Sequence, residues 1–164
     1  MEGLEIERRF LLKRLPQYAL TGQELLIEQF YIRRTDEFFR IRSEAPRARH
    51  HMVYSYDRTF KEKVSHGVFK EKIEVIDLHQ FILFQIEAHK RMKKTRYVVP
   101  HVADLKWQID KPLDCQLVIA EIELPAIDHP LTLPPFLQEV LIMEVTGLEE
   151  FSNYNLAEPI GTQR

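Results

Sequence analysis

Charged residues spaced two apart are the feature of this sequence that most suggests chemistry. Glu5, Glu7 and Arg9 have this spacing near the N-terminus. Because residues i, i+2 and i+4 of a β-strand point to the same side, these three side chains would share one face. Further sets with the same spacing are Arg40 and Arg42, Lys61 and Lys63, Lys70, Lys72 and Glu74, Lys94 and Arg96, and Glu121 and Glu123. The pattern predicts several strands that each carry a charged face.

The sign of the charge differs from one set to the next. Acids predominate in the first and last sets, and bases in the sets between them. An antiparallel sheet often has one solvated, charged face, but such a face would mix the two signs freely. Arginine and lysine bind phosphate oxygens, whereas carboxylates bind Mg²⁺, which in turn bridges to phosphate. The sorted charges therefore favour a site for a complex of a metal ion with a polyphosphate.

The elements that must position these charges are mainly strands. Alternating apolar and polar residues predict strands in nine segments, which are residues 4–12, 26–33, 38–43, 52–64, 68–76, 93–99, 105–110, 117–124 and 141–146. Helices are expected from an N-cap at Asp77 to about Arg91, and from Pro135 to about Leu141. Mostly antiparallel strands with few helices indicate an α+β fold. If the sheet closes into a barrel, the charged faces line a tunnel and helices cover the apolar outer side.

Composition and length limit the class of protein. The chain has 164 residues, of which 45% are hydrophobic and 29% charged, and its net charge is −2. These values fit one globular domain over residues 1–164 and indicate no nucleic-acid or membrane partner. The single cysteine, Cys115, excludes a disulfide framework, and no apolar stretch suggests a signal peptide or a membrane span. We therefore expect a cytoplasmic protein.

The motif Glu5-x-Glu7-x-Arg9 resembles the ExExK signature of the CYTH superfamily, the triphosphate tunnel metalloenzymes. Further matches follow in family order: Phe39-Arg40-Ile41-Arg42, Thr59-Phe60-Lys61, Lys94-Thr95-Arg96-Tyr97, Trp107-Gln108-Ile109-Asp110, Ala120-Glu121-Ile122-Glu123-Leu124, Glu144-Val145-Thr146-Gly147 and Ser152-Asn153-x-Asn155-Leu156-Ala157. Together they cover nearly the whole chain. The resemblance implies a closed eight-stranded antiparallel β-barrel, a tunnel with a charged interior and helices packed outside. It also implies hydrolysis of a triphosphate with Mg²⁺ or Mn²⁺.

The resemblance also implies roles for individual residues. The expected substrate-binding set consists of Arg40, Arg42, Lys61, Lys63, Lys72, Lys94 and Arg96. The expected metal ligands are Glu5, Glu7, Glu121 and Glu123. Asp110 and Glu144 would act as further ligands or orient water, and Arg9 occupies the position of the signature lysine. We count these last three as candidate catalytic residues.

Three places depart from the family pattern, of which the last is the tail Gly147-Leu148-Glu149-Glu150-Phe151, where the family tends to have an Asp after the glycine and a basic-aromatic pair. Arg9 keeps the charge of the signature lysine, but it cannot act as a lysine of lowered pKa. After the Lys61 strand, the family usually has a strand with alternating acids. Here Lys70 and Lys72 occupy those places, and a shift of two residues would let only Glu74 contribute. Which of these three side chains lines the tunnel is left open by the sequence.

Several functions are compatible with such a barrel. Hydrolysis of inorganic triphosphate is favoured, because no obvious base-recognition motif occurs in the chain. The alternatives are a class IV-type adenylate cyclase, a thiamine triphosphatase, and a non-catalytic module that binds polyphosphate or nucleotides. The last is suggested by Lys70 and Lys72. The expected partner is a small-molecule triphosphate, and a homodimer is expected by analogy with the family.

Overall fold

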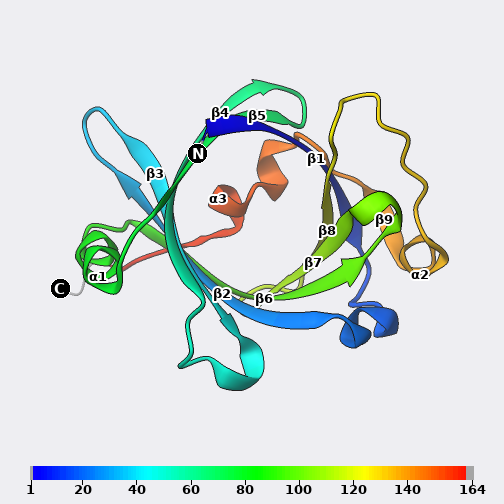
Figure 1. Cartoon of the computed structure of the whole chain (residues 1–164), viewed down its shortest axis with the longest axis horizontal. Coiled ribbons are helices and arrows are strands. Elements are labelled where there is room, and N and C mark those ends of the chain that lie inside the picture. The colour runs from blue at the N-terminus through cyan, green and yellow to red at the C-terminus, as the bar shows by residue number, and fades with distance from the viewer. Residues whose placement is uncertain (1, 162–164) are drawn as a thin grey trace.

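The computed structural model describes residues 2–161, in which most of the chain forms one closed sheet. Its long strands are β1 (Glu2–Leu12), β2 (Gln23–Arg33), β3 (Phe38–Pro46), β4 (Ser55–Ser65), β5 (Val68–Val75), β6 (Lys90–Pro100), β7 (Lys106–Pro112) and β8 (Val118–Glu123). Neighbouring strands follow the order β6, β2, β3, β4, β5, β1, β8 and β7, and a pairing between β7 and β6 closes the ring. All these pairings are antiparallel. Within residues 2–161 the structure thus confirms the α+β fold with a closed eight-stranded antiparallel barrel (Figure 1).

Two shorter strands extend this sheet. β9 (Leu141–Glu144) pairs with the end of β1, and β10 (Glu158–Pro159) pairs with the start of β6. All nine strands expected from alternation are present, with ends displaced by a few residues. The strand periodicity was therefore a sound guide to the barrel wall.

The helices are short. α1 (Leu78–Ile86) begins at the expected N-cap Asp77, which forms a capping box with Gln80. The other helices are α2 (Pro135–Gln138), α3 (Asn153–Leu156) and the 3₁₀ turns η1 (Gln17–Thr21), η2 (Arg47–Arg49), η3 (Val102–Asp104) and η4 (Glu149–Phe151). None of the helices in the described part of the chain has the length and apolar composition that a bilayer crossing would need.

The predicted end of the first helix near Arg91 is wrong. α1 ends at Ile86, and the backbone N–H of His89 already donates to the carbonyl of Tyr31 at 3.0 Å. From Lys90 onward the chain pairs with β2 as β6. Lys90 and Arg91, which the helical pattern assigned to the helix, therefore belong to a β-strand.

The apolar core lies on the outer side of the barrel wall. Phe10 and Trp107 belong to a buried cluster on one side, and Leu137 of α2 packs against it. On another side, Phe39 packs with Phe81 of α1. Each fully buried side chain of this size contributes about 2 kcal/mol. The outer layers thus stabilise the barrel and leave the interior to charged residues.

One end of the interior is occupied by the C-terminal segment. Figure 1 shows α3 within the ring of strands. Phe151 packs with Leu11 of β1 and Ile119 of β8, whose side chains face inward, and Tyr154 of α3 contacts Tyr31 of β2. This segment therefore forms part of the wall of any cavity inside the barrel.

Candidate active site

The pairing of β1 with β8 brings acidic side chains together inside the barrel. The register places Glu7 opposite Glu123 and Arg9 opposite Glu121. Cross-strand partners lie on the same face of a sheet, and here that face is the interior, because the alternate residues belong to the outer core. The predicted metal-ligand residues therefore lie on one inner wall, on two adjacent strands.

Three of these carboxylates converge. One oxygen from each of Glu5, Glu7 and Glu121 lies within 4.8 Å of the others, and we call these residues the acid cluster. The ammonium of Lys61 is 2.5 Å from the Glu5 carboxylate and 3.5 Å from that of Glu7. The guanidinium of Arg9 is 3.3 Å from Glu121. Two basic side chains thus partly balance three acids.

The pKa values indicate an excess of negative charge. Burial and then the neighbouring Glu121 raise the pKa of Glu7 from 4.5 to about 8. Burial and then Glu5 raise the pKa of Glu123. Burial opposes ionisation of Glu121, but Arg9 and Arg96 outweigh it and lower its pKa. Carboxylate oxygens that converge in this way are suitable ligands for a hard divalent cation such as Mg²⁺ or Mn²⁺. The residues present therefore fit the expected metal.

A second inner wall of the barrel, which we call the cationic wall, includes two arginines on the inner face of β3. Arg40 donates to the hydroxyl of Thr59 at 3.3 Å, and Arg42 donates to the side-chain carbonyl of Gln29 at 3.2 Å. The Nε atoms of both arginines are buried without a hydrogen-bond partner in residues 2–161. Burial and then the nearby Arg40 lower the pKa of Arg42 to about 10. Unsatisfied guanidinium donors next to one another are what a polyanion would satisfy.

Two further predicted phosphate-binding residues, Lys94 and Arg96, are engaged by Asp110. Lys94 donates to one Asp110 oxygen at 2.6 Å, and Arg96 donates to both oxygens at 2.7 and 2.8 Å. We call these three residues the Asp110 group. Burial opposes ionisation of Asp110, but Arg96 and Lys94 hold its pKa well below the usual range. Burial lowers the pKa of Lys94 to about 7. Asp110 therefore fixes two basic side chains in place and lies outside the acid cluster.

Two predicted site residues, Glu144 and Lys72, do not lie in the barrel interior with the others. Glu144 lies opposite Phe10, on the outer face of β1, where Arg8 donates to it at 2.8 and 2.9 Å. Lys72 lies opposite Phe60, on the outer face of β5, with its ammonium 3.0 Å from Glu74. The registers of β9 and β5 thus place both side chains outside the interior.

The register of β5 brings in an acid that the sequence did not indicate. Glu71 lies opposite Lys61 on β4, and both face inward. Lys70, Lys72 and Glu74 share the outer face, so none of these three lines the tunnel. Burial and then Glu5 raise the pKa of Glu71.

The turn between β4 and β5 sets this register. Gly67 has φ of +71°, and a Cβ there would lie 2.7 Å from the carbonyl oxygen of Glu7. A bulge between Lys63 and Ser65 precedes this turn. A glycine-containing turn is visible in the sequence, but the bulge is not, and together they decide which face of β5 points inward.

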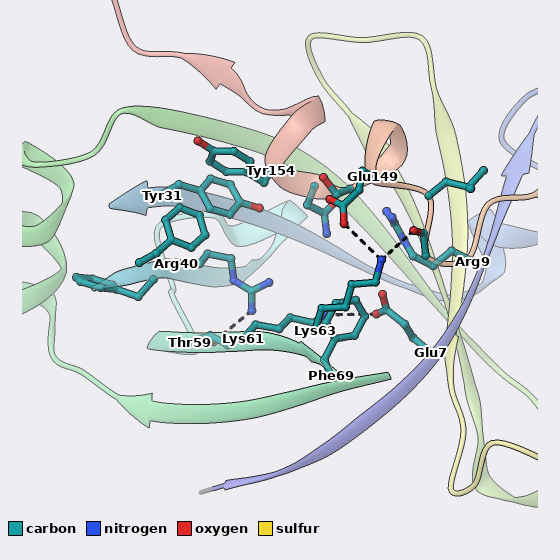
Figure 2. A pocket seen from close by; sticks show the side chains of 16 residues that line it. Glu7, Arg9, Tyr31, Arg40, Thr59, Lys61, Lys63, Phe69, Glu149 and Tyr154 are labelled. Carbon is teal, nitrogen blue, oxygen red and sulfur yellow. Dashed lines mark hydrogen bonds and ion pairs between the residues drawn. The ribbon is translucent and has the colours of Figure 1, made fainter. Parts of the chain in front are cut away.

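A cavity of about 250 Å³ lies between these walls (Figure 2). The charged residues that line it are Glu7, Arg9, Arg40, Lys61, Lys63 and Glu149. Tyr31, Phe38 and Tyr154 form an aromatic end, with edge or stacked contacts at centroid distances of 5.2–6.2 Å. The cavity is below the roughly 300 Å³ at which pockets for drug-sized ligands begin, so it suits a small ligand.

The C-terminal segment contributes to this cavity, which sequence reasoning missed. The ammonium of Lys63 is 3.4 Å from Glu149, that of Lys94 is 3.4 Å from Asn153, and Arg9 donates to the carbonyl of Phe151 at 2.6 Å. The segment shows no strand or helix periodicity, so its place inside the barrel could not be inferred from pattern alone.

No protein-family model and no curated protein matches the sequence. Solved structures do match. The inorganic triphosphatase NE1496 is 23% identical, with 93% of each chain covered and a TM-score of 0.59. The PH1819 protein from Pyrococcus horikoshii OT3 is 16% identical, with 76% of this chain and 80% of that one covered and a TM-score of 0.57. The chain shares its closed-barrel fold with these structures.

A third match has the same architecture. The putative adenylyl cyclase HpAC1 from Hippeastrum, described as having a dominant triphosphatase activity, is 16% identical. The match covers 77% of this chain and 80% of that one, with a TM-score of 0.53. At these identities the comparisons support the fold. The closed barrel that the resemblance implied is thus confirmed, and the roles of the site residues rest on their own geometry.

Proposed function

We propose that the protein hydrolyses a small triphosphate, with inorganic triphosphate as the favoured substrate, and that it requires Mg²⁺ or Mn²⁺. The observation that carries the proposal is the arrangement of two opposed walls. The convergent carboxylates of Glu5, Glu7 and Glu121 form one, and Arg40 and Arg42, whose buried Nε donors lack a partner within residues 2–161, belong to the other.

Each wall supplies a different requirement of the reaction. Phosphoryl transfer needs positioning and neutralisation of charge more than covalent chemistry. Arg40, Arg42 and Lys61 would bind phosphate oxygens, and the arginines can grip two oxygens at once. The acid cluster, with Glu123 beside it, would hold the divalent cation, which when bound would neutralise charge on the phosphates. Glu71, opposite Lys61, would orient the attacking water.

The size of the cavity supports the inorganic substrate. A volume of about 250 Å³ leaves little room for a large organic group beside three phosphates. The inorganic triphosphatase NE1496, which shares the fold over 93% of this chain, is consistent with this choice. The aromatic end formed by Tyr31, Phe38 and Tyr154 favours a second candidate, an organic triphosphate whose ring packs there.

The placement of β5 weakens the alternative of a non-catalytic binding module. That alternative was suggested by lysines in place of tunnel acids, but Lys70 and Lys72 face outward and Glu71 faces inward. An acid is therefore present on the inner face of β5 after all. The cytoplasmic location and the homodimer stay predictions.

The test is phosphate release by the purified protein from inorganic triphosphate, ATP and thiamine triphosphate, each with Mg²⁺, Mn²⁺ or a chelator. We expect release from inorganic triphosphate at the highest kcat/KM, and none with the chelator. The absence of release from every substrate, by protein whose circular dichroism shows it to be folded, would contradict the proposal. Formation of cyclic AMP from ATP would instead show that the protein is an adenylate cyclase.

A further inference from the structure

Lys61 stands between the two walls of the cavity. It projects inward from β4, and its ammonium is 2.5 Å from Glu5 and 3.5 Å from Glu7. The same nitrogen is 4.2 Å from the centre of the Phe69 ring. Figure 2 shows Lys61 reaching toward Glu7 from the floor of the cavity. The ammonium of Lys61 is therefore the positive charge that neutralises Glu5 and Glu7 in the acid cluster.

A divalent cation would need the same oxygen atoms. The oxygens of the acid cluster lie within 4.8 Å of one another, and Mg²⁺ binds oxygen at about 2.1 Å. An ammonium in contact with the Glu5 carboxylate occupies one oxygen of that carboxylate and repels a second cation at this range. Lys61 and the metal ion therefore compete for Glu5 and Glu7.

Lys61 has another position available to it. It shares the inner face of β4 with Thr59, which contacts Arg40, so a phosphate bound by Arg40 would lie within reach of its four-carbon stem. Its side chain is 28% exposed, in contrast to 8% for Arg9. Arg9 is held by the Phe151 carbonyl as well as by Glu121. Of these two bases, Lys61 is the more exposed and therefore the better able to change its contacts.

We propose that Lys61 is an exchangeable counter-ion that couples metal binding to triphosphate binding. Without ligand, it neutralises Glu5 and Glu7 and opposes the divalent cation. A bound triphosphate draws the ammonium away from the carboxylates, and the metal ion then binds in its place. Because coupling between two ligands is reciprocal, the metal ion also strengthens the binding of triphosphate. The inference rests on the proposed function, since it concerns the same site.

The chain offers a matched control. Lys63 lies two residues further on the same face of β4, but its ammonium contacts Glu149 and the carbonyl of Gly147 in place of the acid cluster. Removing its charge should alter the overall charge of the cavity as much as removing that of Lys61. The difference between the two variants therefore isolates the contact with Glu5 and Glu7.

The experiment is calorimetric titration of the full chain with MnCl₂, with and without a methylene-bridged triphosphate analogue that cannot be hydrolysed. For Lys61→Met without the analogue, we expect Mn²⁺ to bind about tenfold more tightly than to the wild type. Lys63→Met should bind Mn²⁺ as the wild type does. The analogue should tighten Mn²⁺ binding about tenfold in the wild type and much less in Lys61→Met.

Lys61→Arg keeps the charge and should return the Mn²⁺ affinity toward the wild-type value, while thermal unfolding confirms that each variant is folded. Mn²⁺ affinity in Lys61→Met that equals or falls below that of the wild type would overturn the coupling. The absence of Mn²⁺ binding by all variants would overturn the metal site together with it. Failure of the proposed function appears separately, as lack of phosphate release, and leaves these affinities measurable.

Discussion

The acid cluster and the Asp110 group are both buried in the same barrel, but their charges are balanced differently. In the Asp110 group, two bases donate to one carboxylate through contacts of 2.6–2.8 Å. In the acid cluster, three carboxylates converge on Lys61 and Arg9 at 2.5–3.5 Å, and the pKa of Glu7 rises to about 8. The first arrangement is satisfied by the protein itself, whereas the second has acids in excess. Buried charges in the Asp110 group thus stabilise the barrel, whereas those in the acid cluster remain available to a positively charged ligand.

The largest effect that distinguishes the two groups should come from Asp110→Asn. This change leaves Lys94 and Arg96 buried without their shared carboxylate, and breaking a buried ion pair costs about 3–5 kcal/mol. We expect that loss in the free energy of unfolding measured with urea. Asp36→Asn, in the exposed turn between β2 and β3, should change it by less than about 0.5 kcal/mol. Equal stability of the two variants would show that the Asp110 group does not support the fold.

Glu7→Gln should have the opposite profile. It removes one acid from a cluster with acids in excess, so we expect the stability without metal to be kept or raised. Metal-dependent phosphate release should fall by about 100-fold, because a ligand of the proposed metal site is lost. Glu28→Gln, which pairs with Lys93 on the outer side, should release phosphate as the wild type does. A Glu7 variant that keeps its activity but unfolds easily would reverse the assignment of the two groups.

The stability of the protein should also depend on pH through Glu7. Its pKa is about 8 in the folded protein and 4.5 ordinarily, so the folded state holds a proton that the unfolded state releases. The resulting stabilisation is complete below about pH 4.5 and is lost as the pH rises to about 8. We expect the Tm of the wild type, measured with a chelator, to fall more across this range than that of Glu7→Gln. Curves of Tm against pH that run parallel for the two proteins would contradict this expectation. Added Mn²⁺ should reduce the difference in Tm between them.

The sequence predicted the strands of the barrel wall better than the side chains that lie inside the barrel. Alternation located β1 to β9, because one face of most of these strands is apolar and packs beneath α1, α2 or the loops, whereas the two-residue strand β10 was not predicted. On β3 and β8 the charges occupy only the inner face within the motif, and on β1 only Arg8 departs from this pattern, so the side of Glu5, Arg40 and Glu121 could be inferred. β5 carries charges on both faces, and its orientation depends on a turn and a bulge.

The C-terminal residues escaped prediction for another reason. Glu149, Asn153 and Tyr154 enter the cavity from turns and a single helical turn, which have no periodicity to detect. Their positions depend on long-range contacts, such as the packing of Phe151 against Leu11 and Ile119. Contacts of this kind depend on the three-dimensional arrangement of the barrel and leave no local pattern in the sequence.

The smallest predicted difference concerns the two faces of β5. Glu71→Gln should lower kcat/KM for triphosphate by about tenfold, because Glu71 lies opposite Lys61 on the inner face of the barrel and is proposed to orient water. Lys72→Met should leave kcat/KM within about twofold of the wild type, since surface pairs such as Lys72 with Glu74 contribute little. Both values come from steady-state phosphate release at saturating Mg²⁺. If Lys72→Met were the more damaging change, the inner face of β5 would have to carry the lysines, and the binding-module alternative would regain its support.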